Sequence, residues 1–288
     1  MKKFKKYISV IMPLIYMILL LIASVIGLVI INLIINVIIG LFTGEINYER
    51  DIIFDTPHLA SLLSSSTVAL VFLAWYRRLK KNDGLVKKRR LALKDKGFLI
   101  VWGIGMVFFV NGIVDLFIIA LEIYFPQLVS DYINMMSVMY EGSLIIIAIR
   151  VAIMAPILEE LVFRGVILKK AKNIMPFYAA NIIQAILFGL IHLNWIQGLY
   201  AFPIGILLGY ITRRYRSIIP SIVSHALLNG YSVLHLANNR LAEESIDISR
   251  WFFIVTTIVG GALFVLGLIK IRRNTHIKVN ATMEEKIY

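Results

Sequence analysis

The sequence contains no cysteine. This absence excludes disulfide bonds, zinc sites with thiolate ligands and a cysteine nucleophile. Acidic residues are also scarce, because 17 Asp and Glu stand against 30 Lys and Arg, for a formal net charge of +13. The basic residues occur in short blocks between apolar stretches, and no zinc-finger or other nucleic-acid-binding signature accompanies them. We therefore expect no nucleic-acid partner.

Long polar segments are missing as well, because 59% of the 288 residues are hydrophobic. The mean hydropathy is +0.83, and the apolar blocks are long enough to cross a bilayer, which takes roughly 20 residues per helix. We predict an all-α polytopic membrane protein with about eight transmembrane helices, forming a single integral membrane domain over residues 1–288. The predicted spans are residues 8–42, 59–76, 98–121, 143–168, 177–193, 199–212, 218–236 and 251–269.

Lys and Arg gather in alternate connections between these spans. They dominate the N-terminal tail, 77–96, 169–176, 213–217 and the tail from residue 270. The intervening connections carry more acidic than basic residues in total; they are 43–58, 122–142, 193–198 and 237–250. Because basic loops stay on the cytoplasmic side, we predict that both termini are cytoplasmic. The short basic tails are typical of a protein of the bacterial cell membrane.

Residues 154–164, with the sequence MAPILEELVFR, place two adjacent carboxylates in an otherwise apolar helix. A charge within the hydrocarbon layer costs several kcal/mol, so such a pair indicates a functional site. Residues four apart share a helix face, which predicts an ion pair between Glu160 and Arg164. Glu159 points about 100° away from Glu160 and is free to face a cavity as a general base. The structural alternative is a cluster of charges at a helix end.

Two histidines lie in the apolar spans that follow. The fifth predicted span ends with Phe188-Gly189-Leu190-Ile191-His192, and the seventh contains His225-Ala226-Leu227-Leu228-Asn229. The spacing places His225 and Asn229 on one helix face as neighbouring hydrogen-bond donors. A single intramembrane histidine is usually a hydrogen-bonded core residue. Two of them, an asparagine and a carboxylate pair on three helices favour one convergent site.

The sixth predicted span contains Gly205 and Gly209 in a G-x-x-x-G pattern, which favours close helix packing rather than chemistry. The expected depths of the site residues in the membrane do not all agree. At 1.5 Å per residue, Glu159 and His225 lie about 14 Å from the predicted cytoplasmic ends, and His192 lies near 24 Å. For His192 to join the site, the fifth helix must start deeper, tilt or bend.

The motifs Glu159-Glu160-x-x-x-Arg164, Phe188-x-x-x-His192 and His225-x-x-x-Asn229 resemble, in type and order, those of the CAAX-processing and bacteriocin-processing intramembrane proteases. This family, also called Abi, includes the type II CAAX prenyl endopeptidase. The resemblance places the catalytic core on the fourth to seventh predicted spans, about residues 143–236. It implies an intramembrane endopeptidase that hydrolyses a bond in a peptide or membrane-anchored protein at the lipid bilayer.

The resemblance also implies a role for each motif residue. Glu159 would activate a water molecule, which His192 helps to hold and polarise. His225 and Asn229 would donate hydrogen bonds to the oxyanion, and the ion pair of Glu160 would hold the geometry of the site. A carboxylate base and preorganised donors are strong contributors to amide hydrolysis in a low-dielectric site. This mechanism, which we favour, needs no cofactor.

Three other interpretations remain open. Family members have been described both as metalloproteases and as glutamate peptidases, and Glu159, His192 and His225 could supply three ligands to a catalytic zinc ion. An ion-coupled transporter could use the same groups as a proton pathway, although no internal repeat indicates one. A non-catalytic membrane immunity or interaction protein could keep the fold. For an active enzyme we expect maturation or degradation of peptides, including bacteriocins, or self-protection against them.

Overall fold

The computed structural model describes residues 2–43, 57–81, 93–241 and 250–274, and all regular secondary structure in them is helical. This confirms the all-α prediction. The segments α5 to α7 join into one continuous helix, which we call the core helix, and η1 and η2 are its π-helical parts. In chain order the elements are α1 (Lys2–Thr43), α2 (Pro57–Lys81), α3 (Leu93–Tyr124), α4 (Pro126–Met139), α5 (Leu144–Ile147), η1 (Ala148–Met154), α6 (Ala155–Glu160), η2 (Leu161–Ile167), α7 (Leu168–Ala171), α8 (Phe177–Leu190), α9 (Trp195–Tyr215), α10 (Ile219–Leu241) and α11 (Arg250–Asn274).

Five helices in the described parts of the chain are long and apolar enough to cross a membrane. They are Lys6–Thr43, Leu59–Lys81, Leu99–Tyr124, Trp195–Tyr215 and Ile254–Arg272, and they coincide with the first, second, third, sixth and eighth predicted spans. The other three predicted spans are also helical, but the fourth contains π-helical turns and the fifth has only 14 residues in α8. The chain is an integral membrane protein, and the count of eight crossings stays a prediction.

The predicted orientation depends on segments that the structure leaves largely undescribed. The basic connection 77–96 is described only at its two ends, and the tail from residue 270 only as far as residue 274. Most of the predicted outer connections 43–58 and 237–250 also lies outside the described residues. The cytoplasmic location of both termini therefore stays a prediction.

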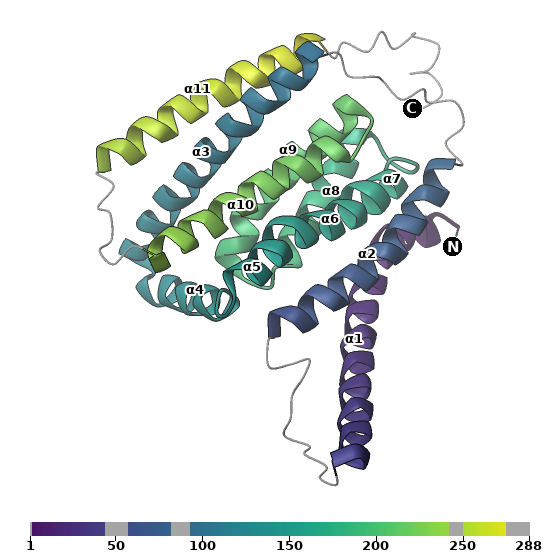
Figure 1. Ribbon diagram of the computed structural model, residues 1–288. Helices are drawn as coiled ribbons and strands as arrows, with labels where there is room; N and C mark the ends of the chain where they lie inside the picture. The colour runs from purple at the N-terminus through teal and green to yellow at the C-terminus, as the bar shows by residue number, and fades with distance from the viewer. Residues whose placement is uncertain (1, 44–56, 82–92, 242–249, 275–288) are drawn as a thin grey trace.

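The core helix lies between two flanking groups of helices (Figure 1). On one side α3 and α11 pack along each other, and on the other α1 and α2 pack together and both contact the core helix. The hairpin of α8 and α9 and the helix α10 complete the centre of the molecule. The largest hydrophobic cluster joins α2 to the core helix through fully buried side chains such as Phe72, Val162 and Phe163. The carboxylate pair therefore lies beside the largest hydrophobic cluster of the described residues.

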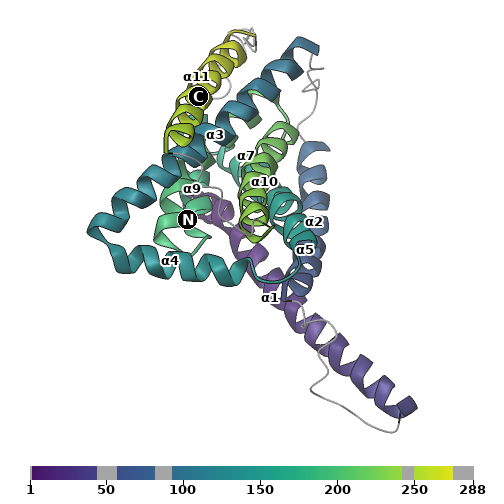
Figure 2. The same ribbon diagram turned by 60° about the vertical axis from the view of Figure 1, so that its left-hand side comes forward.

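Helix α4 was not predicted, because its residues fall within the outer connection 122–142. Its 14 residues are too few to cross a bilayer, and polar side chains interrupt its apolar ones, so hydropathy gives no signal for it. Pro126 occupies the first turn, where a missing N–H costs nothing. Val129 and Tyr132 are buried against Ile196 of α9. Figure 2 shows α4 lying across one end of the helices.

The G-x-x-x-G pattern of α9 packs closely against α8, as predicted. A Cβ atom added at Gly205 would lie 3.0 Å from the Cβ of Ala185, and one added at Gly209 would overlap Oδ1 of Asn181. The two glycines therefore allow the backbone of α9 to approach the polar side chains of α8.

Gly209→Ala is expected to lower the free energy of unfolding by about 1–3 kcal/mol, because the new methyl group overpacks the contact with Asn181. Thermal unfolding of the purified protein in detergent measures this change. Gly27→Ala in α1 is the matched control, since its Cβ meets no atom within 4 Å. The control should stabilise the helix by roughly 0.5–1 kcal/mol, and equal effects of the two substitutions would contradict the packing assignment.

Candidate active site

The carboxylate pair ends α6, a six-residue α-helical segment between the π-helical segments η1 and η2. Pro156 stands in the first turn of α6. Proline has no N–H to donate and its ring clashes with the carbonyl four residues earlier, so the α-helical ladder is disturbed just before the pair. Single π-helical turns inside helices often occur at functional sites. The local sequence thus explains why the helix changes pitch beside Glu159.

Glu160 and Arg164 form the ion pair that their spacing predicts. Nη1 of Arg164 donates to Oε1 of Glu160 at 2.7 Å, and both side chains are fully buried. Nη2 of Arg164 donates to the carbonyl of Gly205 at 3.2 Å. The guanidinium carbon also lies 4.4 Å from the centre of the Phe188 ring. The ion pair therefore fixes the core helix to both α8 and α9.

His225 brings α10 to the same carboxylate. Its Nδ1 lies 2.9 Å from Oε1 of Glu160. An ionised carboxylate only accepts hydrogen bonds, which assigns the proton of this contact to Nδ1. The other ring nitrogen, Nε2, lies 3.6 Å from Oε2 of Glu159. Glu160 thus orients the ring of His225 so that Nε2 is directed at Glu159.

Glu159 is the accessible member of the pair. Its side chain is 23% exposed, whereas that of Glu160 is 0% exposed. The 3.6 Å separation from His225 is longer than a hydrogen bond, and Oε2 of Glu159 is buried without a hydrogen-bond partner. Oε2 of Glu160 is also buried without a partner, so the exposure of Glu159 is what makes it the candidate for chemistry. The different environments of the two carboxylates match the prediction from helix geometry.

Asn229 lies one turn after His225 and also contacts the core helix. Its Nδ2 donates to the carbonyl of Val151, in η1, at 2.9 Å. The amide nitrogen carries two hydrogens, so one donor remains after this bond. His225 and Asn229 therefore face the core helix together, as their spacing predicts, and connect α10 to it at two points.

His192 lies beyond the end of α8, in the turn that leads to α9. Its Nδ1 is 2.8 Å from the carbonyl of Phe188, and its ring packs edge-on against the Phe188 ring with the centroids 5.1 Å apart. The Phe188 ring packs edge-on against His225 as well, at 5.7 Å. Among the described residues, no hydrogen bond or ion pair joins His192 to Glu159 or His225. The structure therefore brings Glu159, His225 and the Glu160 ion pair together and leaves His192 one aromatic ring away.

The end of α8 bears on the predicted difference in depth between His192 and the residues Glu159 and His225. Because α8 ends at Leu190, a straight-helix count does not apply to His192.

The zinc ligand set of Glu159, His192 and His225 does not form a cluster. In the described parts of the chain, no three His, Cys, Asp or Glu residues are placed to hold a metal ion. The residues present thus do not fit the zinc alternative, and we derive no step through a metal.

Two polar residues of α8 that the sequence analysis missed belong to this site. Nε2 of Gln184 donates at 2.9 Å to the carbonyl of Gly205, which also accepts from Arg164. It further contacts Oδ1 of Asn181 at 2.9 Å, and Nδ2 of Asn181 donates to the carbonyl of Ile206 at 3.0 Å. Gln184 precedes Phe188 by four residues, so helical spacing places it on the motif face of α8. A polar side chain on the helix face that carries Phe188 was the sequence signal that could have identified Gln184.

Gln184→Leu is expected to lower the free energy of unfolding by about 1–3 kcal/mol, because it leaves buried partners without their hydrogen bonds. Denaturant titration in detergent measures this loss. Gln127→Leu in α4 is the matched control, because Gln127 bonds an exposed Asp131 carboxylate at the surface. Equal stability of the Gln184 variant and the wild type would show that the α8 network does not support Arg164.

Comparison with known families gives a match over the part of the chain that carries these residues. Residues 141–231 fit the family model described as type II CAAX prenyl endopeptidase Rce1-like. No curated protein and no solved structure matches the chain. The matched segment includes the core helix, the hairpin of α8 and α9, and α10 as far as residue 231, so that it contains Asn229. Residues 141–231 of this integral membrane protein are thus similar to the CAAX protease family, whose members are peptide hydrolases.

Proposed function

We propose that the protein is an intramembrane endopeptidase in which Glu159 is the general base. The observation that carries this proposal is the contrast within the carboxylate pair. Glu160 is fully buried and its Oε1 is bonded to Arg164 and His225, whereas Glu159 is partly exposed and forms no hydrogen bond within the described structure. A partly exposed carboxylate within reach of a water molecule suits proton abstraction.

In the proposed reaction, Glu159 removes a proton from water as the water oxygen bonds to the scissile carbonyl carbon. The carbonyl oxygen becomes an oxyanion, which accepts hydrogen bonds from Nε2–H of His225 and from the second N–H of Asn229. This role requires His225 as the imidazolium, with Nδ1–H donating to Glu160 and Nε2–H to the oxyanion. Collapse of the tetrahedral intermediate breaks the C–N bond. The carboxylic acid of Glu159 then gives its proton to the leaving amine, which restores the carboxylate.

Glu160 and Arg164 have a positioning role in this proposal, because they hold the His225 ring from the side opposite the reacting atoms. His192 has an assisting role. Its Nδ1 is engaged by the Phe188 carbonyl, which leaves Nε2 to accept a hydrogen bond from the attacking water. The Phe188 ring separates the two histidines and fixes the orientation of both.

The two histidines should therefore differ in importance. His225→Gln is expected to lower kcat about 10²–10³-fold, as loss of one oxyanion donor does in other peptidases. His192→Gln is expected to have a smaller effect, because no hydrogen bond joins it to the carboxylates in the described structure. Steady-state kinetics of the two variants side by side measure the contrast. A larger loss at His192 would assign the water-holding step to His192 instead.

We propose a peptide or a membrane-anchored protein segment as the substrate, reached from the cytoplasmic side of a bacterial cell membrane. Maturation, degradation or immunity involving a bacteriocin is the cellular role that we favour. The family match and the apolar surroundings of the site support a peptide or membrane-anchored substrate, and the distribution of basic residues supports the cytoplasmic side. The bacteriocin role rests on the resemblance of the sequence motifs alone.

The test is cleavage of a peptide library by the membrane-reconstituted protein, with wild type beside Glu159→Ala and with and without a strong chelator. Cleavage that is lost in the variant and retained with chelator supports the proposal and identifies the substrate. Loss with chelator in the wild type would indicate a metal enzyme. No cleavage by any preparation would favour a transporter or a non-catalytic immunity protein.

A further inference from the structure

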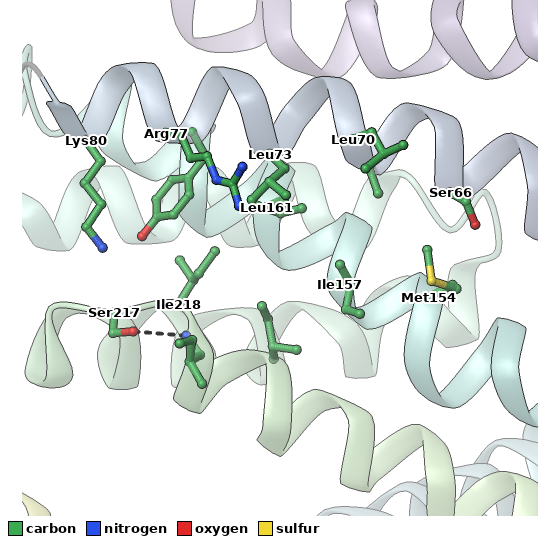
Figure 3. A pocket seen from close by; sticks show the side chains of 14 residues that line it. Ser66, Leu70, Leu73, Arg77, Lys80, Met154, Ile157, Leu161, Ser217 and Ile218 are labelled. Carbon is green, nitrogen blue, oxygen red and sulfur yellow. Dashed lines mark hydrogen bonds between the residues drawn. The ribbon is translucent and has the colours of Figure 1, made fainter.

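A groove of about 740 Å³ lies between α2 and the start of α10 (Figure 3). One face of α2 forms the first wall, Ile218 and Ile222 form the second, and Ile157 and Leu161 of the core helix lie between them. Leu70 and Ile219 on the two walls are 67% and 65% exposed. Because these helices are part of a membrane protein, the open side of the groove faces lipid.

The groove is apolar along most of its length and cationic at one end. Arg77 and Lys80 lie at that end on α2, with Ser217 on the opposite wall. No acidic side chain is among the described residues that line the groove. Nζ of Lys80 lies 5.5 Å from the centre of the Tyr76 ring, and Arg77 has no hydrogen bond or ion pair within the described structure. Arg77 and Lys80 are thus available to bind an anion at one end of the apolar groove.

The length of the groove matches one leaflet of a bilayer. From Ser66, at the far end, to Arg77 the helix rises about 16 Å at 1.5 Å per residue, and half of the hydrocarbon core is about 15 Å thick. Helix α2 is itself a candidate membrane span that ends at Lys81, so both cations lie at the predicted boundary with the headgroups. A small free anion would contact only the cationic end and would leave the apolar part of the groove unoccupied.

We propose that this groove binds one anionic phospholipid, with its phosphate at Arg77 and Lys80 and one acyl chain between α2 and α10. The chain contacts Ile157 and Leu161, on either side of the carboxylate pair, and Ile222, three residues before His225. The bound lipid would therefore stabilise the contact between the core helix and α10. This binding site is independent of the chemistry proposed for Glu159.

Native mass spectrometry of the purified full-length protein tests the proposal, with phosphatidylglycerol as the anionic probe and phosphatidylcholine as the neutral one. Arg77→Gln/Lys80→Gln removes the cations, and Leu70→Trp obstructs the groove while keeping them. Lys169→Gln/Lys172→Gln is the matched control, because it removes the same charge from residues that do not line the groove. Monodisperse elution in size-exclusion chromatography verifies that each variant is folded.

We expect the wild type and the control to retain phosphatidylglycerol in preference to phosphatidylcholine. Loss of both cations should weaken phosphatidylglycerol retention roughly thirtyfold, and Leu70→Trp should release it as well. Equal retention of the two lipids, or unchanged retention in Arg77→Gln/Lys80→Gln, would overturn the proposal and indicate non-specific surrounding lipid. Slower peptide cleavage by Leu70→Trp with unchanged lipid retention would overturn it in favour of a substrate segment in the groove.

Discussion

Glu159→Gln is expected to lower kcat about 10²–10⁴-fold, the usual contribution of a general base. Glutamine keeps the size of the side chain and can still hold a water molecule, but it cannot accept the proton. The substitution should leave the fold intact, because Glu159 is partly exposed and forms no hydrogen bond in the described structure. Steady-state kinetics in reconstituted membranes, together with thermal unfolding, measure both effects.

Two further variants sharpen this result. Glu122→Gln removes an exposed carboxylate at the end of α3 and should leave kcat unchanged. Glu159→Asp keeps a carboxylate but withdraws it by one methylene, so its activity should lie between those of the wild type and Glu159→Gln. Full activity of Glu159→Gln would show that another group takes the proton from water.

Arg164→Met is expected to lower the free energy of unfolding by about 3–5 kcal/mol, because it leaves the fully buried Glu160 carboxylate without its cation. The loss also removes the contacts of the guanidinium with Gly205 and Phe188. Arg272→Met in α11 is the control, since that arginine is exposed. Unfolding by denaturant in detergent measures both variants.

A double-mutant cycle separates the ion pair from the packing of Arg164. Glu160→Gln combined with Arg164→Met removes both charges and keeps an amide oxygen near Nδ1 of His225. The double variant should be more stable than the sum of the two single losses implies, because no uncompensated buried charge remains. Strictly additive losses would show that Glu160 and Arg164 do not stabilise each other.

The sequence predicted the parts of this fold that depend on local spacing. All eight ranges that hydropathy predicted are helical over most of their length in the structure, because a membrane span is a long uninterrupted apolar segment. The ion pair of Glu160 with Arg164 followed from an i,i+4 spacing, which any helical turn brings into contact. The shared orientation of His225 and Asn229 followed from the same rule.

Features that depend on tertiary packing could not be predicted in this way. The carbonyl of Gly205 accepts from both Arg164 and Gln184 only because α9 approaches α8 closely, and no local pattern connects these three residues. His192 leaves its helix at a turn, so its depth could not be counted along a straight helix. Helix α4 lacks the length that makes a hydropathy signal.

The measurement that tests the central claim most directly is single-turnover cleavage of an identified substrate in H₂¹⁸O by reconstituted wild type and Glu159→Gln. The account predicts one ¹⁸O atom in each new carboxyl terminus for the wild type, since water attacks the scissile carbonyl directly. It also predicts almost no product from the variant within the same time. Unlabelled product from the wild type, or labelled product formed at an undiminished rate by Glu159→Gln, would contradict it.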